Sequence, residues 1–434
     1  MLWSIIFTLS ITAIKAHHHR DIDYFIRKSG IQKSTFRLND AHNGHYHFTD
    51  LDDNRDLWIF WRQVMLKHIT HDKANLYRMS HAHGKMQTPK KWQEFPCPLN
   101  GTKSQETPSH IQKLRPGDID VVAAIGDSLT AGNGIMWWPS PVVVIAEFRG
   151  MSFSGGGIED WRTILTLPNI LKVFNPNLYG FASDHVLAMD RAAHLNVAEP
   201  MMLSRDLLYQ VQVLIQRMKQ DPLIDMQHHW KLLTIFVGTN DLCTEMCHYE
   251  NMWDFLQQHE QDILEALREL KQNVPRLLVN LIPAPNMVNL IRNLRNISEF
   301  CDLAYNFACS CLMSKTYGPE YLQRAQEFII RWQAIDEHVA SRAEFHSSDF
   351  GVNYHSFMAN FTIPLQTNGD LDMRYFGRDC FHFSQLGNAA MANILWNHML
   401  ETGNPRDTEF RPPFQKFECP TLEQPYLAVQ GNIY

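Results

Sequence analysis

Two short apolar runs that each end at a glycine constrain the fold of this chain most strongly. Residues 120–125 (Asp-Val-Val-Ala-Ala-Ile) precede Gly126, and residues 231–237 (Lys-Leu-Leu-Thr-Ile-Phe-Val) precede Gly238. A short, almost continuously apolar run bounded by turn residues is typical of a parallel strand that is buried on both faces. The two runs therefore predict two buried parallel strands inside a covered sheet.

Helical and strand patterns alternate along the rest of the chain. A third buried strand is predicted at 276–282, and residues 350–354 indicate an edge strand. Helical periodicity is found at about 203–219, 252–272, 320–342 and 385–400. Alternation of this kind predicts an α/β fold, a mostly parallel sheet in a three-layer α/β/α sandwich. Chemistry in such sheets lies at the carboxyl ends of the strands.

The first 16 residues read as a secretory signal peptide. Residues 2–14 are uncharged and mostly apolar, Ala16 is small, and a polar His-His-His-Arg run follows. The apolar run is shorter than a spanning helix, and no other run approaches the required length of about 20 residues. We therefore expect a secreted, extracellular protein without a transmembrane anchor.

The cysteines and glycosylation motifs agree with this export route. An even count of eight cysteines behind a signal peptide predicts a set of disulfides whose pairing is not readable from sequence. The alternative is zinc, but the spacings Cys243-x-x-x-Cys247 and Cys309-x-Cys311 lack the repeated CxxC pairs of structural zinc sites. Sequons at 100–102, 296–298 and 360–362 predict a glycoprotein.

Residues 17–95 form a distinct N-terminal extension, predicted to be mostly helical or irregular, ahead of a main domain at 96–434. The extension holds ten of the 22 histidines, for which surface positions are favoured over metal ligation because regularly spaced acidic or Cys ligands are lacking. Residues 56–67 are amphipathic, with apolar residues at helical spacing at 57, 58, 61, 64 and 65. This helix could lie on a lipid surface, but packing against the main domain is favoured.

The net charge of −7 argues against nucleic acid as a partner, because phosphate binding needs clustered Lys and Arg. It also argues against simple electrostatic attraction to anionic lipid. An apolar patch could still make peripheral contact with a lipid surface.

Three polar segments could carry chemistry. Ser128 follows the first strand and its glycine, and a serine hydroxyl needs a general base to become a nucleophile. His382 is the candidate base, and Asp379, three residues earlier, can share one face of a turn with it and orient its ring. Asn240 follows the second strand, and its amide can donate to a developing oxyanion. Asp241 beside it is also a common turn or helix-cap residue.

These segments, in this order, resemble the SGNH, or GDSL, hydrolase superfamily. The family carries Ser in Gly-Asp-Ser (126–128 here), Asn in Gly-x-Asn-Asp (238–241) and His in Asp-x-x-His (379–382). The resemblance is closer still to the phospholipase B1-like subfamily, of the membrane-associated phospholipase B type. It covers about 95–427 and is carried by residues 95–97, 122–130, 166–171, 174–178, 241–243, 379–384 and 419–420.

The resemblance implies a flavodoxin-like SGNH fold and a role for each matching residue. Ser128 would be the nucleophile, His382 the base and Asp379 its orienting partner. The oxyanion hole would comprise the backbone N–H of Ser128, the side chain of Asn240 and the backbone N–H at position 201. The family has Gly at that position, six residues into a block that here begins at Asn196, whereas this chain has Met201. If a positive φ is needed there, methionine carries strain.

The implied activity is hydrolysis of acyl esters in glycerophospholipids and lysophospholipids, a phospholipase and lysophospholipase activity that needs no metal and no organic cofactor. Relatives carry several repeats and a membrane anchor, whereas one repeat and no anchor are expected here. One alternative is an esterase of other lipids or of small or carbohydrate esters. Another is a secreted, non-catalytic protein that binds lipid or a partner, which Met201 favours and the otherwise intact set of site residues opposes.

Overall fold

The computed structural model describes residues 55–292, 294, 298–313, 318–359, 361–402 and 408–429, and these residues belong to one compact unit. The predicted signal peptide and the predicted extension as far as residue 54 lie outside the described residues. Among the helices that are described, none is both long enough and apolar enough to cross a membrane.

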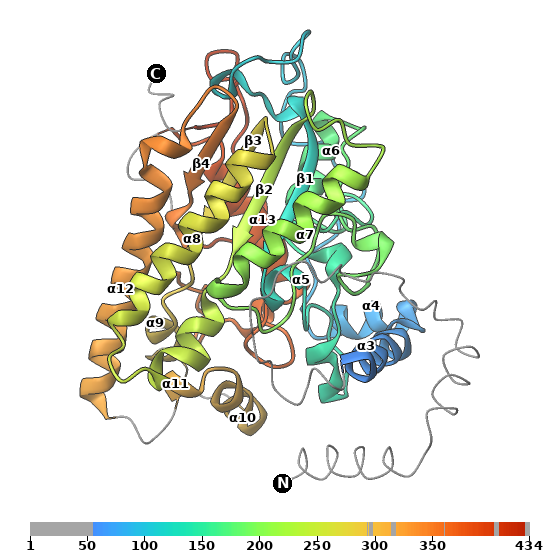
Figure 1. Cartoon of the computed structure of the whole chain (residues 1–434). Coiled ribbons are helices and arrows are strands. Elements are labelled where there is room, and N and C mark those ends of the chain that lie inside the picture. The colour runs from blue at the N-terminus through green and yellow to red at the C-terminus, as the bar shows by residue number, and fades with distance from the viewer. Residues whose placement is uncertain are drawn as a thin grey trace. The chain divides into compact units, whose positions relative to one another are not determined.

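A four-stranded parallel sheet forms the centre of the unit (Figure 1). Its strands are β1 (Ile119–Gly126), β2 (Trp230–Phe236), β3 (Leu277–Ile282) and β4 (Phe350–Tyr354), in the spatial order β1-β2-β3-β4. All four predicted strands are confirmed, and β4 is at an edge as expected. Gly126 pairs with Phe236, and Phe236 pairs with Ile282, so the carboxyl ends of the first three strands are level.

Helices cover both faces of the sheet, which confirms the α/β class. Successive side chains of β1 point to opposite faces, so Val121, Ala123 and Ile125 join one buried apolar cluster and Val122 joins another. The first cluster includes residues of α7 and α8, which Figure 1 shows crossing one face of the sheet, and the second includes α6 and α13. The covering helices are α6 (Leu167–Phe174), α7 (Leu207–Gln220), α8 (Asp254–Asn273), α12 (Pro319–Ser341) and α13 (Gln385–His398).

The four helices predicted from periodicity correspond to α7, α8, α12 and α13, with ends that differ by a few residues. Shorter helices lie in the connections: α5 (Ser128–Ala131), α9 (Met287–Arg292), α10 (Glu299–Ala308) and α11 (Ser310–Met313). The short helices α5 and α10 flank the candidate site and are described with it.

Two helices precede the sheet, α3 (Arg55–Thr70) and α4 (Lys73–Ala82). α3 confirms the amphipathic helix predicted at 56–67. Leu66 and Ile69 of α3 are buried in a third apolar cluster with residues such as Val143 and Phe148 of the main domain. The helix is thus packed on the main domain, which is the favoured alternative. The domain boundary predicted between residues 95 and 96 stays a prediction.

All eight cysteines are paired, as the even count predicted. The disulfides are Cys97–Cys419, Cys243–Cys309, Cys247–Cys311 and Cys301–Cys380. Three of them attach the α10–α11 segment to the loop after β2 and to the loop before α13. These two loops carry Asn240 and His382.

Candidate active site

The carboxyl end of β1 turns tightly into α5. Gly126 has a φ of +146°, and a Cβ atom built on it would lie 2.0 Å from the carbonyl oxygen of Phe236, so only glycine fits between β1 and β2 here. The Asp127 carboxylate caps α5 by accepting a hydrogen bond of 2.9 Å from the backbone N–H of Leu129. Ser128 is therefore the first residue of a capped helix at the carboxyl edge of the sheet.

Ser128, His382 and Asp379 lie together, as the sequence predicted. The Nε2 atom of His382 is 2.8 Å from the Ser128 hydroxyl oxygen, and its Nδ1 atom is hydrogen-bonded to the Asp379 carboxylate. The same carboxylate accepts the backbone N–H groups of Phe381 and His382 at 3.2 and 3.1 Å, which closes the turn. A hydroxyl beside one ring nitrogen and a carboxylate beside the other can generate a nucleophilic serine.

The environment of His382 favours its protonated form. Burial lowers the pKa of this imidazole, but the negative charge and hydrogen bond of Asp379, together with the charge of Asp127, outweigh burial and raise the pKa above 6.5. All three side chains are buried. An imidazolium formed during proton transfer from Ser128 would thus be stabilised where it arises.

The loop that carries Asp379 and His382 is fixed from several sides. Cys380, between them, forms the disulfide with Cys301 of α10 and has a φ of +62°. The Tyr305 hydroxyl, also on α10, donates a 2.6 Å hydrogen bond to the carbonyl oxygen of Cys380. Ser384 then caps α13 by accepting the N–H of Gly387. The start of α13 thus fixes the carboxyl end of this loop.

The segment that contains Met201 runs along β1 towards the same edge as Ser128. The N–H groups of Val197 and Glu199 donate to the carbonyl oxygens of Ala124 and Gly126, at 3.0 and 3.1 Å. Met201 follows two residues later with a φ of +67° and a side chain that is 61% exposed. The positive φ anticipated from the family pattern is present, and a non-glycine residue occupies it.

Asn240 links the carboxyl end of β2 to the segment that contains Met201. Its side-chain amide donates a 2.9 Å hydrogen bond to the carbonyl oxygen of Met202. Asp241 has a structural position, since it accepts hydrogen bonds from both the backbone N–H and the hydroxyl of Ser204. Burial raises the pKa of Asp241 to about 6. Asn240 and Met201 thus belong to two loops joined by one hydrogen bond.

One residue that positions the site was missed in the sequence. Gln210 of α7 brackets Gly126, because its amide oxygen accepts the Gly126 N–H and its amide nitrogen donates to the Gly126 carbonyl, both at 2.8 Å. Gln210 occupies a core position of an amphipathic helix. A polar residue on the apolar face of that helix was the only available signal.

Cys247, His248 and Cys311 place potential metal-ligand atoms within 4.8 Å of one another. Cys247 and Cys311 are bonded to each other, however, so neither offers the thiolate that binds a metal.

A sequence model described as GDSL-like Lipase/Acylhydrolase matches residues 122–395. Human "Phospholipase B1, membrane-associated" is 37% identical over 337 residues, which cover 76% of this chain and 22% of that protein. The proteins of the same name from Mus musculus and Rattus norvegicus are each 35% identical, over 76% and 78% of this chain and 22% and 23% of their own lengths. The chain thus spans less than a quarter of the length of these relatives.

Among solved structures, phospholipase A1 from Streptomyces albidoflavus NA297 aligns with a TM-score of 0.30 at 13% identity, over 62% of this chain and 95% of that one. An extracellular lipase from Streptomyces rimosus aligns with a TM-score of 0.29 at 12% identity, over 62% and 94%.

Proposed function

Because the chain belongs to the GDSL-like lipase/acylhydrolase family, we propose that it is a serine esterase that hydrolyses acyl esters of glycerophospholipids and lysophospholipids. The observation that carries this proposal is the continuous hydrogen-bond chain from the Ser128 hydroxyl through His382 to Asp379. The phospholipid substrate class is supported by the relatives that bear the name phospholipase B1.

In the proposed reaction the Ser128 oxygen attacks the acyl carbonyl while Nε2 of His382 takes the hydroxyl proton. Asp379 stabilises the resulting imidazolium. His382 then gives the proton to the leaving alcohol oxygen as the ester bond breaks, leaving an acyl group on Ser128. Water attacks the acyl-enzyme, again with His382 as base, and the free fatty acid leaves.

The proposed oxyanion hole comprises the backbone N–H groups of Ser128 and Met201 and the side-chain amide of Asn240. The hydrogen bond from Asn240 to Met202 supports this assignment, because it couples two of the three donors. One well-placed donor of this kind is worth about 3 kcal/mol of the activation barrier.

We also propose that the protein acts outside the cell and makes peripheral contact with lipid. Four disulfides support an oxidising compartment. Leu303 and Phe307 of α10 are 60% and 83% exposed, and Cys301 of the same helix is bonded to the loop of His382. These exposed apolar side chains are suited to contact with the surface that holds the substrate.

The test is activity labelling followed by substrate profiling of the full-length protein. Wild type, Ser128→Ala and Ser154→Ala are treated with a fluorophosphonate probe; Ser154 is a buried serine whose hydroxyl has no hydrogen-bond partner among the residues the structure describes. Labelling is expected in wild type and Ser154→Ala only. The proteins are then assayed on phosphatidylcholine vesicles, lysophosphatidylcholine, triglyceride and a short p-nitrophenyl ester.

Equal labelling of Ser128→Ala would overturn the nucleophile assignment. Turnover of short esters alone would favour the alternative esterase, and lipid binding without turnover would favour the non-catalytic alternative.

A further inference from the structure

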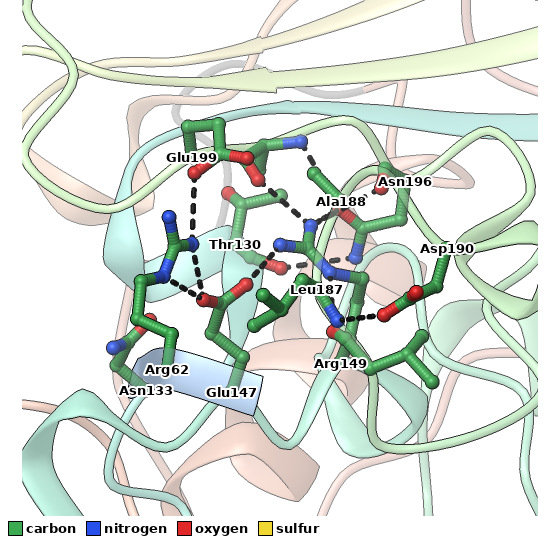
Figure 2. Close-up of polar contacts among 12 residues, drawn as sticks. Arg62, Thr130, Asn133, Glu147, Arg149, Leu187, Ala188, Asp190, Asn196 and Glu199 are labelled. Carbon is green, nitrogen blue, oxygen red and sulfur yellow. Dashed lines mark hydrogen bonds and ion pairs between the residues drawn. The ribbon is translucent and has the colours of Figure 1, made fainter. Parts of the chain in front are cut away.

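Four charged side chains form a charge-balanced network, in which three members are buried and the fourth, Glu199, is partly exposed (Figure 2). Glu147 and Arg149 are fully buried, and Arg62 of α3 is 7% exposed. The Glu147 carboxylate accepts hydrogen bonds from Arg62 at one oxygen and from Arg149 at the other. Arg62 also donates a 2.9 Å hydrogen bond to Glu199, so one guanidinium bridges two carboxylates. Two positive and two negative charges thus compensate one another at a site where only the Glu199 carboxylate has substantial contact with water.

Arg149 attaches this network to the chain segment that leads to Met201. Its Nη1 atom lies within hydrogen-bond distance of the carbonyl oxygens of Asn196 and Ala198, at 3.1 and 2.8 Å, and of the Asn196 side-chain oxygen, at 3.0 Å. The Asn196 amide nitrogen in turn donates to the carbonyl oxygen of Thr130 in α5, at 3.0 Å. The segment is therefore tied to the helix that begins with Ser128.

Glu199 is the point where the network meets the proposed oxyanion hole. Its backbone N–H is bonded to the Gly126 carbonyl, and its own carbonyl accepts the N–H of Met202 at 3.4 Å. Met201 lies between these two bonds. Arg62 holds the Glu199 side chain and is thereby connected, through one residue, to the turn that contains Met201.

We propose that Arg62 is a positioning residue for catalysis, which holds the 196–202 segment and thereby the Met201 oxyanion donor in place. This inference rests on the proposed function. Arg62 lies in α3, outside the region 122–395 that the family shares, so α3 would be a working part of the catalytic unit. Removing one partner of a buried charge network leaves a charge uncompensated, and the segment must then shift or admit water. A displacement of about 1 Å at a catalytic donor can cost up to about 100-fold in rate.

The test measures kcat and KM on a short soluble ester, with active sites counted by fluorophosphonate titration, well below the unfolding temperature. The variants are Arg62→Gln, Arg62→Lys, Glu199→Gln and the double variant Arg62→Gln/Glu199→Gln. Tyr77→Phe is the matched control, because Tyr77 also joins an N-terminal helix to the main domain. Its hydroxyl donates a 3.0 Å hydrogen bond to Glu159, which is not part of the 196–202 segment.

We expect kcat per titrated site to fall about 10- to 100-fold in Arg62→Gln and in Glu199→Gln, with KM changed less than about threefold, because the oxyanion exists only after the carbonyl is attacked. The double variant should lose little more than either single variant. Arg62→Lys should have a kcat between those of wild type and Arg62→Gln. Lysine keeps the positive charge but lacks the planar guanidinium that bonds two carboxylates at once. Tyr77→Phe should leave kcat within about twofold.

A purely structural role predicts lower unfolding temperatures with unchanged kcat per titrated site, and that result would overturn the inference. If Arg62→Gln does not fold, Glu199→Gln decides the question, because its carboxylate is partly exposed. A wild type that hydrolyses no ester overturns the proposed function and this inference together. An active wild type with unaltered variants overturns only the inference.

Discussion

The Nε2 atom of His382 lies 2.8 Å from the hydroxyl oxygen of Ser128, although 254 positions separate the two residues in the chain. The contact is possible because a capped turn at the carboxyl end of β1 meets a disulfide-bonded loop that leads into α13. Each partner also has contacts of its own, since Gln210 bonds both backbone groups of Gly126 and the Cys301–Cys380 bond holds the loop of His382. The following predictions concern what holds each of them.

The pH dependence of the reaction should report on His382. The base must be neutral to accept the Ser128 proton, and Asp379 helps to raise its pKa above 6.5. The value of kcat/KM should therefore fall about tenfold per pH unit on the acidic side of that raised pKa. In Asp379→Asn the acidic fall of kcat/KM, the acidic limb of the pH profile, should move to lower pH, and kcat should decrease by up to about 10⁴-fold.

The control for this profile is Asp225→Asn. Asp225 and His228 form an exposed pair with the same three-residue spacing, and that pair is not part of the site. An acidic limb that stays in place in Asp379→Asn, or that moves equally in Asp225→Asn, would contradict the assignment of His382.

Substitution of Met201 should separate backbone strain from side-chain function. Left-handed φ costs a residue with a Cβ about 1 kcal/mol more than glycine, so Met201→Gly should be more stable than Met201→Ala by about that amount. Both variants keep the backbone N–H, so kcat on short esters should stay within about threefold of wild type. Thermal unfolding and kinetics on short and long acyl chains provide the measurement. A hundredfold loss on short esters in Met201→Gly would show that the side chain itself is needed.

Asp127 should make the protein less stable as the pH rises. Burial raises its pKa to about 7, against 3.8 for an ordinary aspartate, although the Leu129 N–H opposes this rise. The folded state therefore binds this proton more tightly than the unfolded state, and the stabilisation is present below about pH 4 and lost as the pH rises to about 7. A pKa shift of this size changes the free energy of unfolding by about 4 kcal/mol between these two pH values.

Asp127→Asn keeps a cap acceptor and removes this titration, so the stability of the variant relative to wild type should increase between pH 5 and pH 7.5 in urea unfolding. Asp72→Asn, at the exposed cap of α4, should show no such increase. A constant difference between Asp127→Asn and wild type across this range would refute the prediction.

Two disulfides should have different effects on catalysis. Cys301–Cys380 holds the loop of His382, so Cys301→Ser/Cys380→Ser should lower both the unfolding temperature and kcat. Cys97–Cys419 closes a longer loop of 322 residues, and Cys97→Ser/Cys419→Ser should cost stability, about 2–5 kcal/mol, while kcat of the folded protein is retained. Equal kcat in the two double variants would mean that Tyr305 alone suffices to hold the loop.

The sequence predicted the local parts of the site better than the long-range ones. Ser128 and the pair Asp379–His382 each lie in a short motif at the boundary of a regular element, so the neighbouring residues identify them. The edge position of β4 was also readable, because only a short, weakly apolar run is found there. Disulfide pairing could not be read, since it depends on which loops meet in space.

The charge network of Arg62 was not predictable for a physical reason. Its partners Glu147 and Glu199 lie 85 and 137 positions away, and each residue alone resembles an ordinary surface charge. The predicted apolar face of α3 was centred on Trp61, Val64 and Met65, which are only partly buried, whereas Arg62, Leu66 and Ile69 are buried. Helical periodicity treats arginine as a polar residue that faces solvent. The apolar face predicted for α3 is therefore rotated about the helix axis relative to the face that is buried.

The Cys97–Cys419 bond holds the Cα atoms of two residues that are 322 positions apart at a distance of 5.3 Å. All four strands and the helices between them lie in the closed covalent loop that this bond makes. Fraying of the chain before Cys97 or after Cys419 therefore need not open the sheet or move Ser128 away from His382.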